Sequence, residues 1–318
     1  MEAGRKSLYL VTLVCAGLFV LQFVLPEYHH LIATRIMVLA IFATAFNILF
    51  GYTGLLSLGH AMFFAAGLYT AGMVSYYLEW SAPLALLCAL LVGAAVSMVI
   101  GWVALRTTGV AFMIVTMMFA QVAYLASLYF TTYTRGDEGL VLPESTRSFS
   151  IGDMVVDLTD PATRYFIALA FLAITLGLVY RLIHSPTGRA MVAVRENETR
   201  TRMLGYNTFA IKWWALVYSG TLSAMAGALY ALLFAYVGSS FATIQYSIDA
   251  LLFTLLGGAG TLLGPLLGSF VMFYLVDTAS DFTAAYLLVT GIALVLLVLF
   301  FPKGILGTIR QRYLPWLS

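Results

Sequence analysis

Long apolar runs separated by short polar segments cover most of the chain. A helix needs about 20 mostly apolar residues to cross the hydrocarbon core of a bilayer. The pattern predicts ten such spans, at residues 8–25, 31–50, 59–78, 83–105, 109–130, 164–183, 211–236, 246–258, 263–277 and 283–301. We therefore expect an all-α integral membrane protein that forms a single transmembrane domain over residues 1–318.

The composition excludes a soluble fold. Of the 318 residues, 62% are hydrophobic and only 9% are charged, whereas a soluble domain has about 25% charged residues. The two cysteines and four histidines are scattered, so we expect no metal site and no disulfide framework. The formal charge of +2 gives no indication of a nucleic-acid partner.

The first apolar run follows Arg5 and Lys6 and allows two interpretations. A basic start before an apolar run is typical of a signal peptide. This run extends from Leu8 to Leu25, however, and no small-residue cleavage pattern follows it. Its length favours an uncleaved first span.

The charges in the loops predict the orientation. Lys and Arg concentrate in short cytoplasmic loops. Basic residues gather at both ends of the chain and in the region 181–212, whereas the 131–163 loop carries six acidic residues against two arginines. With ten spans, both termini and the basic region are cytoplasmic and the acidic loop is extracytoplasmic. Arg35 is the exception, and we interpret it as snorkelling outward or as facing a pathway.

This count also predicts a symmetry. Spans two to five start from the outside, and spans seven to ten start from the inside. Two sets of four spans with opposite direction are what an inverted repeat requires. We expect two inverted four-helix halves, with a cytoplasmic loop at about 184–210 between spans six and seven. The halves share no convincing residue-level similarity, so the repeat is a topological hypothesis.

Residues 47–72 interrupt this apolar pattern with glycines and polar side chains. Non-helical backbone at membrane depth is tolerated only where it is buried in protein or lines a water-filled path. The segment is therefore a candidate part of a substrate pathway. Its candidate lining residues are Gly51, Thr53, Gly54, Ser57, Gly59, His60 and Phe63.

Each of these side chains also has a purely structural interpretation. Thr53 and Ser57 can bond to backbone inside a broken helix. A neighbouring carbonyl can satisfy His60, and Phe63 can simply pack between helices. The break itself is either a turn at the cytoplasmic surface or a segment that re-enters toward the midplane.

The 184–212 region has the signals of short helices that dock a partner. Ser185 before Pro186 is a good helix start, and residues 187–197 follow as a short helix. Two acid–base pairs have i, i+4 spacing, Glu196 with Arg200 and Glu198 with Arg202. Gly205 is a natural helix stop. A loop that only fixes the membrane topology would not need these signals, so they favour a role in docking a partner.

Five motifs connect the chain to a known family. They are GYTGLLSLGHAMFFAAGLYTA, GDEGL, SPTGRAMVAVRENETRTRMLGYN, GGAGTLLGPLLGSF and FPKGILG, in that order from about residue 45 to the end. Together they resemble the LivM type of branched-chain amino acid ABC importer permeases. One departure is Leu55, where many members carry glutamine.

The resemblance implies the permease subunit of an ATP-driven importer in a bacterial inner membrane. The implied partners are a second, LivH-like permease, two LivG/LivF-like ATPase subunits, a periplasmic solute-binding protein and membrane lipid. The implied substrate is a branched-chain amino acid or a related small solute, since related permeases move urea, short amides or aromatic acids. The residues implied in ATPase coupling are Gly188, Arg189, Arg195, Glu196, Asn197, Glu198, Leu204 and Gly205.

The sequence itself agrees that energy comes from another subunit. It contains no G-x-x-x-x-G-K-[ST] motif, so it lacks a P-loop for ATP. We expect no cofactor on this chain and no enzymatic activity of its own, with ATP and Mg on the partner subunits.

Two other classes of function compete with this interpretation. An ion-coupled secondary transporter needs carboxylates inside the membrane, and Asp249 and Asp277 are the best candidates, both near predicted span ends. A membrane enzyme needs a convergent set of acid, base or metal ligands. The chain has no H-E-x-x-H motif and no nucleophile beside a base.

Overall fold

The computed structural model describes residues 2–24, 26–151, 154–282, 285–301 and 303–312. Apolar runs form helices because, in lipid, a helix satisfies every backbone polar group within its own segment. The longer helices are α1 (Glu2–Leu21), α2 (Glu27–Asn47), α3 (His60–Tyr77), α4 (Ala82–Ala104), α5 (Val110–Tyr129), α7 (Pro161–His184), α10 (Thr208–Phe234), α11 (Ile244–Gly257), α12 (Gly264–Phe282) and α13 (Tyr286–Phe300).

Short elements connect these helices. The helical ones are η1 (Ile48–Tyr52), α6 (Thr131–Thr134), η2 (Glu144–Thr146), α8 (Pro186–Glu196), α9 (Glu198–Met203), η3 (Ser239–Ala242) and α14 (Ile305–Arg312). The strands are β1 (Leu140–Val141), β2 (Ser148–Ile151), β3 (Met154–Asp157) and β4 (Tyr236–Val237), which form two small antiparallel pairs, β1 with β4 and β2 with β3.

A helix lies at each of the ten predicted span positions. Among the described residues, five helices are both long and apolar enough to cross a membrane, namely Tyr28–Tyr52, α4, α5, α7 and α10. Shorter apolar helices lie at Ser7–Leu21 and in α11. The all-α membrane fold is therefore confirmed. The total of ten crossings and the two inverted halves stay predictions.

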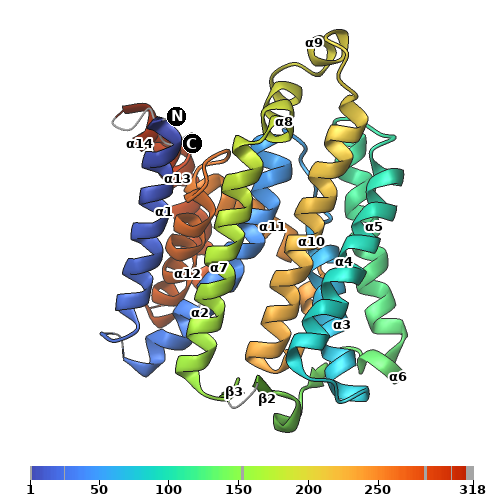
Figure 1. The fold of residues 1–318 in the computed structure, drawn as a ribbon, viewed down its shortest axis with the longest axis vertical. Helices are drawn as coiled ribbons and strands as arrows, with labels where there is room; N and C mark the ends of the chain where they lie inside the picture. The colour runs from blue at the N-terminus through green and yellow to red at the C-terminus, as the bar shows by residue number, and fades with distance from the viewer. Residues whose placement is uncertain (1, 25, 152–153, 283–284, 302, 313–318) are drawn as a thin grey trace.

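Helices α2 and α10 form the centre of the bundle (Figure 1). In the apolar window of each, 83% and 89% of the residues are buried, against 28% for α4 and 22% for α5. Helix α10 packs against α2, α3 and α4, and α2 packs also against α7, α11 and α12. The peripheral helices thus offer apolar side chains outward, as contact with lipid requires.

Glycines bring α3 and α10 into backbone contact. A Cβ atom on Gly67 would lie 1.9 Å from the carbonyl oxygen of Ala224, and one on Gly227 would lie 1.9 Å from that of Phe64. Small residues allow membrane helices to approach this closely. The crossing of α3 and α10 therefore depends on glycine at positions 67 and 227.

The bundle has two distinct ends. Helices α8 and α9 extend beyond one of them, which we call the coupling end, and the start of α1 and α14 lie there too (Figure 1). Strands β2 and β3 lie at the opposite end. The basic 181–212 region and the acidic 131–163 loop are thus at opposite ends, as their charges predict. Which end faces the cytoplasm stays a prediction.

Arg147 anchors the 131–163 loop to the bundle. Its guanidinium is buried and donates to the carbonyl oxygens of Leu158 at 2.8 Å and Leu233 at 3.2 Å. Asp160 then caps α7 by accepting from the backbone N–H of Thr163 at 2.9 Å. This hydrogen bond holds the pKa of the Asp160 carboxyl below its usual value. The described residues of the loop therefore make fixed contacts with the bundle.

Candidate functional site

The break at the end of α2 is a π-helical turn followed by an extended segment. Helix α2 continues into η1. Two backbone hydrogen bonds follow it, from Gly54 N–H to the Phe50 carbonyl at 3.2 Å and from Leu55 N–H to the Leu49 carbonyl at 3.0 Å. Residues 53–59 are not helical, and α3 begins at His60. Single π-helical turns inside helices are frequent at functional sites.

Asn47 joins this break to the loop between α11 and α12. Its buried side chain donates to the carbonyl oxygen of Thr261 at 2.9 Å and accepts from the N–H of Gly260 at 2.9 Å. A Cβ on Gly51 would lie 1.9 Å from Asn47 Oδ1 and 2.4 Å from Gly260 N. Only glycine fits at position 51, because the two loops touch there.

Replacing Asn47 by leucine should destabilise the protein by about 2–5 kcal/mol, because the backbone groups of Gly260 and Thr261 would lose their partners in a buried site. Thermal unfolding of the purified chain in detergent measures the effect. Asn207→Leu is the control, since this asparagine lies exposed at the start of α10 and accepts a single bond, from Ala210 N–H. Equal losses in the two variants would contradict the prediction.

The first turn of α3 lies well inside the bundle. The N–H of Ala61 donates to Ser247 Oγ at 2.8 Å. Ser247 is ten residues before Gly257, the coupling-end terminus of α11, which corresponds to about 15 Å of helix. Residues 53–59 therefore run from the coupling end toward mid-depth, and this geometry favours the re-entrant alternative over a surface turn.

The candidate pathway residues are mostly buried within the chain. Thr53, Ser57, His60 and Phe63 each expose 3% or less of their surface. Thr53 Oγ1 donates to the Ile48 carbonyl at 3.0 Å, and Ser57 Oγ accepts from Gly59 N–H at 3.2 Å. Gly54 is exposed. The structure thus supports the structural interpretation of the two hydroxyls, and their role in a pathway stays a prediction.

His60 links three helices. Its Nε2 lies 2.6 Å from Ser219 Oγ, which donates to the carbonyl oxygen of Ala45 at 2.5 Å. Because that hydroxyl proton is used on Ala45, the network assigns the ring proton to Nε2. The rings of Phe46 and Phe63 lie edge-on at 4.9 and 5.5 Å. A hydroxyl on α10, and not the expected carbonyl, therefore satisfies Nε2 of this histidine, whereas its Nδ1 is buried and has no hydrogen-bond partner among the described residues.

The 184–212 region folds as the two short helices that its signals predict. Ser185 Oγ accepts from Gly188 N–H at 3.1 Å at the start of α8, and Asn197 Oδ1 accepts from Arg200 N–H at 2.8 Å at the start of α9. Gly205 has a φ of +89° and ends α9. Its left-handed conformation explains why a glycine stands there.

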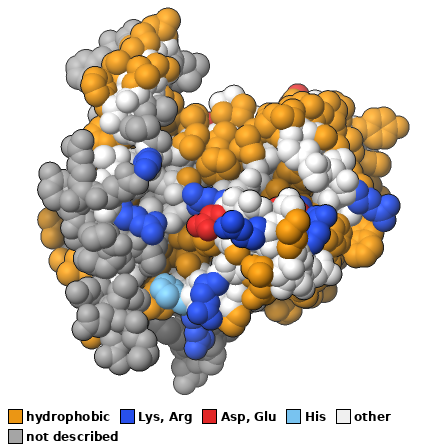
Figure 2. All heavy atoms as spheres, turned by 90° about the horizontal axis from the view of Figure 1, so that it is seen from above, with side chains coloured by type: hydrophobic (Ala, Val, Ile, Leu, Met, Phe, Trp, Pro, Cys, Tyr) orange, Lys and Arg blue, Asp and Glu red, His pale blue; other side chains and the backbone are white. Residues whose placement is uncertain are grey.

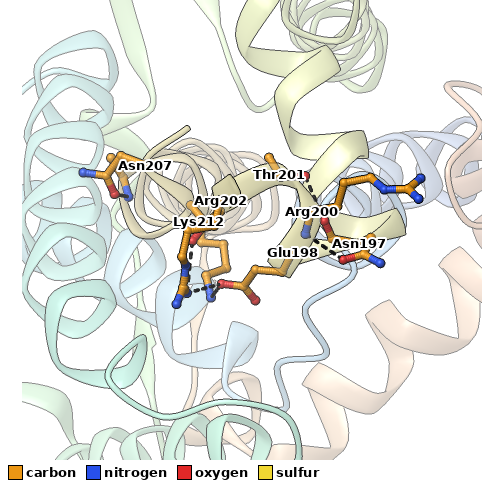
Figure 3. A network of polar contacts seen from close by, with 9 residues as sticks. Asn197, Glu198, Arg200, Thr201, Arg202, Asn207 and Lys212 are labelled. Carbon is orange, nitrogen blue, oxygen red and sulfur yellow. Dashed lines mark hydrogen bonds and ion pairs between the residues drawn. The ribbon is translucent and has the colours of Figure 1, made fainter. Parts of the chain in front are cut away.

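The two predicted ion pairs have different outcomes (Figure 3). Glu198 pairs with Arg202 at 3.3 Å, as predicted, and also with Lys212 of α10 at 2.7 Å, which the sequence did not reveal. No ion pair joins Glu196 to Arg200 in the described part of the chain, so that prediction is wrong. Helix α8 ends at Glu196, and the extended backbone of Asn197 breaks the i, i+4 register.

The carboxylate of Glu198 is fixed by this pairing. Partial burial raises its pKa, but the hydrogen bond and the positive charge of Lys212 outweigh burial and hold the pKa below its usual value. The carboxyl is therefore charged at neutral pH, and it ties α9 to the start of α10.

Arg195 connects the coupling helices to the break. Its guanidinium donates to the carbonyl oxygen of Gly51. A Cβ on Gly54 would lie 2.9 Å from Arg195 Cγ, so α8 packs directly on the segment after η1. The sequence singled out both stretches, and the structure brings them into contact.

The remaining coupling candidates divide into exposed and packed residues. Gly188 packs on α7, where an added Cβ would lie 2.2 Å from the Leu182 carbonyl oxygen. Arg189, Glu196 and Asn197 are exposed. Leu204 is 72% exposed, and two apolar residues that the sequence did not single out lie with it, Met203 at 82% and Tyr206 at 54%. Figure 2 shows Lys, Arg and apolar side chains mixed on this end of the molecule.

Comparison with known proteins identifies the family of this chain. The family model described as "Branched-chain amino acid transport system / permease component" matches residues 29–300. The chain belongs to this family. The resemblance seen in the five motifs is thereby confirmed.

Three relatives show the range of the similarity. The high-affinity branched-chain amino acid transport system permease protein LivM of Salmonella typhimurium is 30% identical over 299 residues, which cover 88% of this chain and 70% of the relative. LivM of Escherichia coli is 29% identical with the same coverage. The ribose import permease protein RbsC of Haemophilus influenzae is 31% identical over 137 residues, 41% of this chain and 42% of that one. No solved structure matches.

Proposed function

We propose that this chain is the permease subunit of an ATP-binding-cassette importer and that α8 and α9 transmit the movement of ATPase subunits to the break after α2. The observation that carries the proposal is the bond from Arg195 to the Gly51 carbonyl. A displacement of α8 must move this carbonyl or break the bond. Because Gly51 also touches Gly260, the displacement reaches α11 and α12 as well.

The exposed apolar residues of α9 are the docking contacts in this proposal. Met203 and Leu204 stand exposed at the coupling end, directly after Arg202. Apolar side chains removed from water contribute most to protein association. Two ATPase subunits, which bind ATP and Mg, would contact them from the cytoplasm. A second permease and a periplasmic solute-binding protein complete the proposed assembly in a bacterial inner membrane.

The variant Met203→Asp/Leu204→Asp should abolish capture of co-expressed ATPase subunits by the purified permease. A carboxylate at each position would be desolvated at the contact, so we expect at least a hundredfold loss of binding, from about 3 kcal/mol or more. Val141→Asp is the control, because this residue is 66% exposed and lies in β1, outside the coupling region. Unchanged capture by the double variant would refute the docking assignment.

The proposed substrate is a branched-chain amino acid or a related small solute. Its support is the similarity to the two LivM relatives, which are named as branched-chain amino acid permeases. The ribose permease among the relatives indicates that related permeases differ in substrate. Leu55, Leu56 and Leu58 are half-buried along the re-entrant segment and give it an apolar surface. Uptake of labelled leucine, compared with urea, acetamide and phenylalanine, tests the proposal, and failure to transport leucine would exclude that substrate.

A further inference from the structure

A cationic cavity lies at the coupling end, beside the 258–263 loop. It has a volume of about 460 Å³ and is lined by Arg195 of α8, Lys303, and Arg310 of α14, together with Thr261 and Gly307. None of the described residues that line it is acidic. Two segments distant in sequence, α8 and residues 303–310, thus bring three basic residues to one space.

The positive charge in this cavity is not compensated by the contacts of its arginines. Arg195 donates to the carbonyl of Gly51, and Arg310 donates to that of Gly260 at 3.5 Å. Both acceptors are neutral. Like charges held close together repel, and an anion between them relieves the repulsion. The cavity therefore fits a negatively charged group.

An apolar groove of about 550 Å³ reaches the same part of the molecule. Helices α1, α2, α12 and α14 form it, and its lining includes Leu10, Leu18, Leu263, Leu267, Tyr274 and Leu306. From Leu263 to Tyr274 it follows eleven residues, or about 16 Å of helix. This matches one leaflet of a hydrocarbon core that is about 30 Å thick.

The cavity and the groove both border α14. Leu306 lines the groove, and the next residue, Gly307, lines the cavity. A soluble anion would need the cavity alone, and an acidic protein segment would have no use for an apolar channel one leaflet long. A molecule with an anionic head and a hydrocarbon tail uses both.

We propose that one anionic phospholipid binds here, with its phosphate among Arg195, Lys303 and Arg310 and an acyl chain in the groove. Basic pockets between membrane helices recognise anionic headgroups in this way. The site is independent of the proposed transport function, because it requires only a bilayer. Its link to that function is Arg195, which is shared with the Gly51 contact.

Binding of phosphatidylglycerol to the purified full-length chain, followed by native mass spectrometry, tests the headgroup site. The variant Lys303→Gln/Arg310→Gln keeps Arg195 and should bind the lipid about thirtyfold more weakly, since each basic residue near an anionic lipid contributes roughly a factor of five. The control Arg189→Gln/Arg200→Gln removes the same charge from exposed positions of α8 and α9. It should bind as the unchanged chain does.

A second variant tests the groove without altering charge. Leu267→Trp fills the apolar channel and should weaken phosphatidylglycerol binding at least tenfold, whereas Leu91→Trp on α4, where Leu91 is 65% exposed, should not. Inorganic phosphate at millimolar concentration should not displace the lipid. Displacement by phosphate alone, binding of phosphatidylcholine as tight as that of phosphatidylglycerol, or loss of ATPase capture with unchanged lipid binding in the Lys303/Arg310 variant would each overturn the proposal.

Discussion

Replacing Arg195 by alanine should reduce uptake about ten- to hundredfold while the transporter still assembles. The guanidinium is the charged donor to the Gly51 carbonyl, and a hydrogen bond to a charged group is worth about 1.5–3 kcal/mol. Each 1.4 kcal/mol corresponds to a factor of about ten. Without this bond α8 can move while the break remains in place, so ATP hydrolysis would continue without transport.

The measurement is ATP hydrolysis and uptake in the same reconstituted vesicles. Arg200→Ala is the matched control, because its side chain is exposed and makes no hydrogen bond or ion pair within the described part of the chain. Its ratio of uptake to hydrolysis should remain normal. Normal uptake by the Arg195 variant would show that the Gly51 contact carries no coupling.

Replacing Gly67 by valine should prevent the permease from folding stably. Its Cβ would already lie 1.9 Å from the Ala224 carbonyl oxygen and 2.6 Å from Ala224 Cα. These are backbone atoms of the most buried helix, so they cannot rotate away as a side chain would. Overpacking commonly costs about 1–3 kcal/mol where side chains can adjust, and we expect more than that here.

Gly177→Val in α7 is the control, since nothing lies within 4 Å of an added Cβ at that position. Yield and melting temperature of the purified chain should remain normal in this variant and collapse in Gly67→Val. Gly227→Val should have the same effect as Gly67→Val, because the Cβ at position 227 meets the Phe64 carbonyl from the other side of the same crossing. A normally folded Gly67 variant would show that the two helices have room to separate.

Local sequence signals predicted the helices and their ends. Apolar runs located the ten longer helices, with ends that differ by up to six residues, because helix formation in lipid depends on the segment's own backbone. The start of α8 at Ser185 and Pro186 and the stop at Gly205 were predicted by the same logic, since caps and left-handed turns act within four residues. The same locality explains the failure of the Glu196–Arg200 pair. The side chain of Asn197 starts a new helix between them.

The contacts that form the candidate site are not local. Asn47 and Gly260 are 213 positions apart, and Arg195 and Gly51 are 144 apart. Hydrophobic patterns and caps contain no information about such separations. The sequence therefore indicated that the break and the coupling helices are unusual. It did not indicate that they are in contact. Polar residues inside an apolar chain indicated where the candidate site lies. Only the structure identified the residues with which they form contacts.

The short helix α11 has a consequence for how the protein is made. Its 14 residues extend only about 21 Å, less than a hydrocarbon core of about 30 Å. Alone in lipid it would expose unpaired backbone groups at one end. In the finished protein its first turn accepts a bond from Ala61 of α3, and Thr254 near its end donates to the Ala43 carbonyl of α2 at 3.2 Å. We therefore expect α11 to insert stably only after α2 and α3 are in place. Insertion of the second half of the chain would then depend on the folded first half.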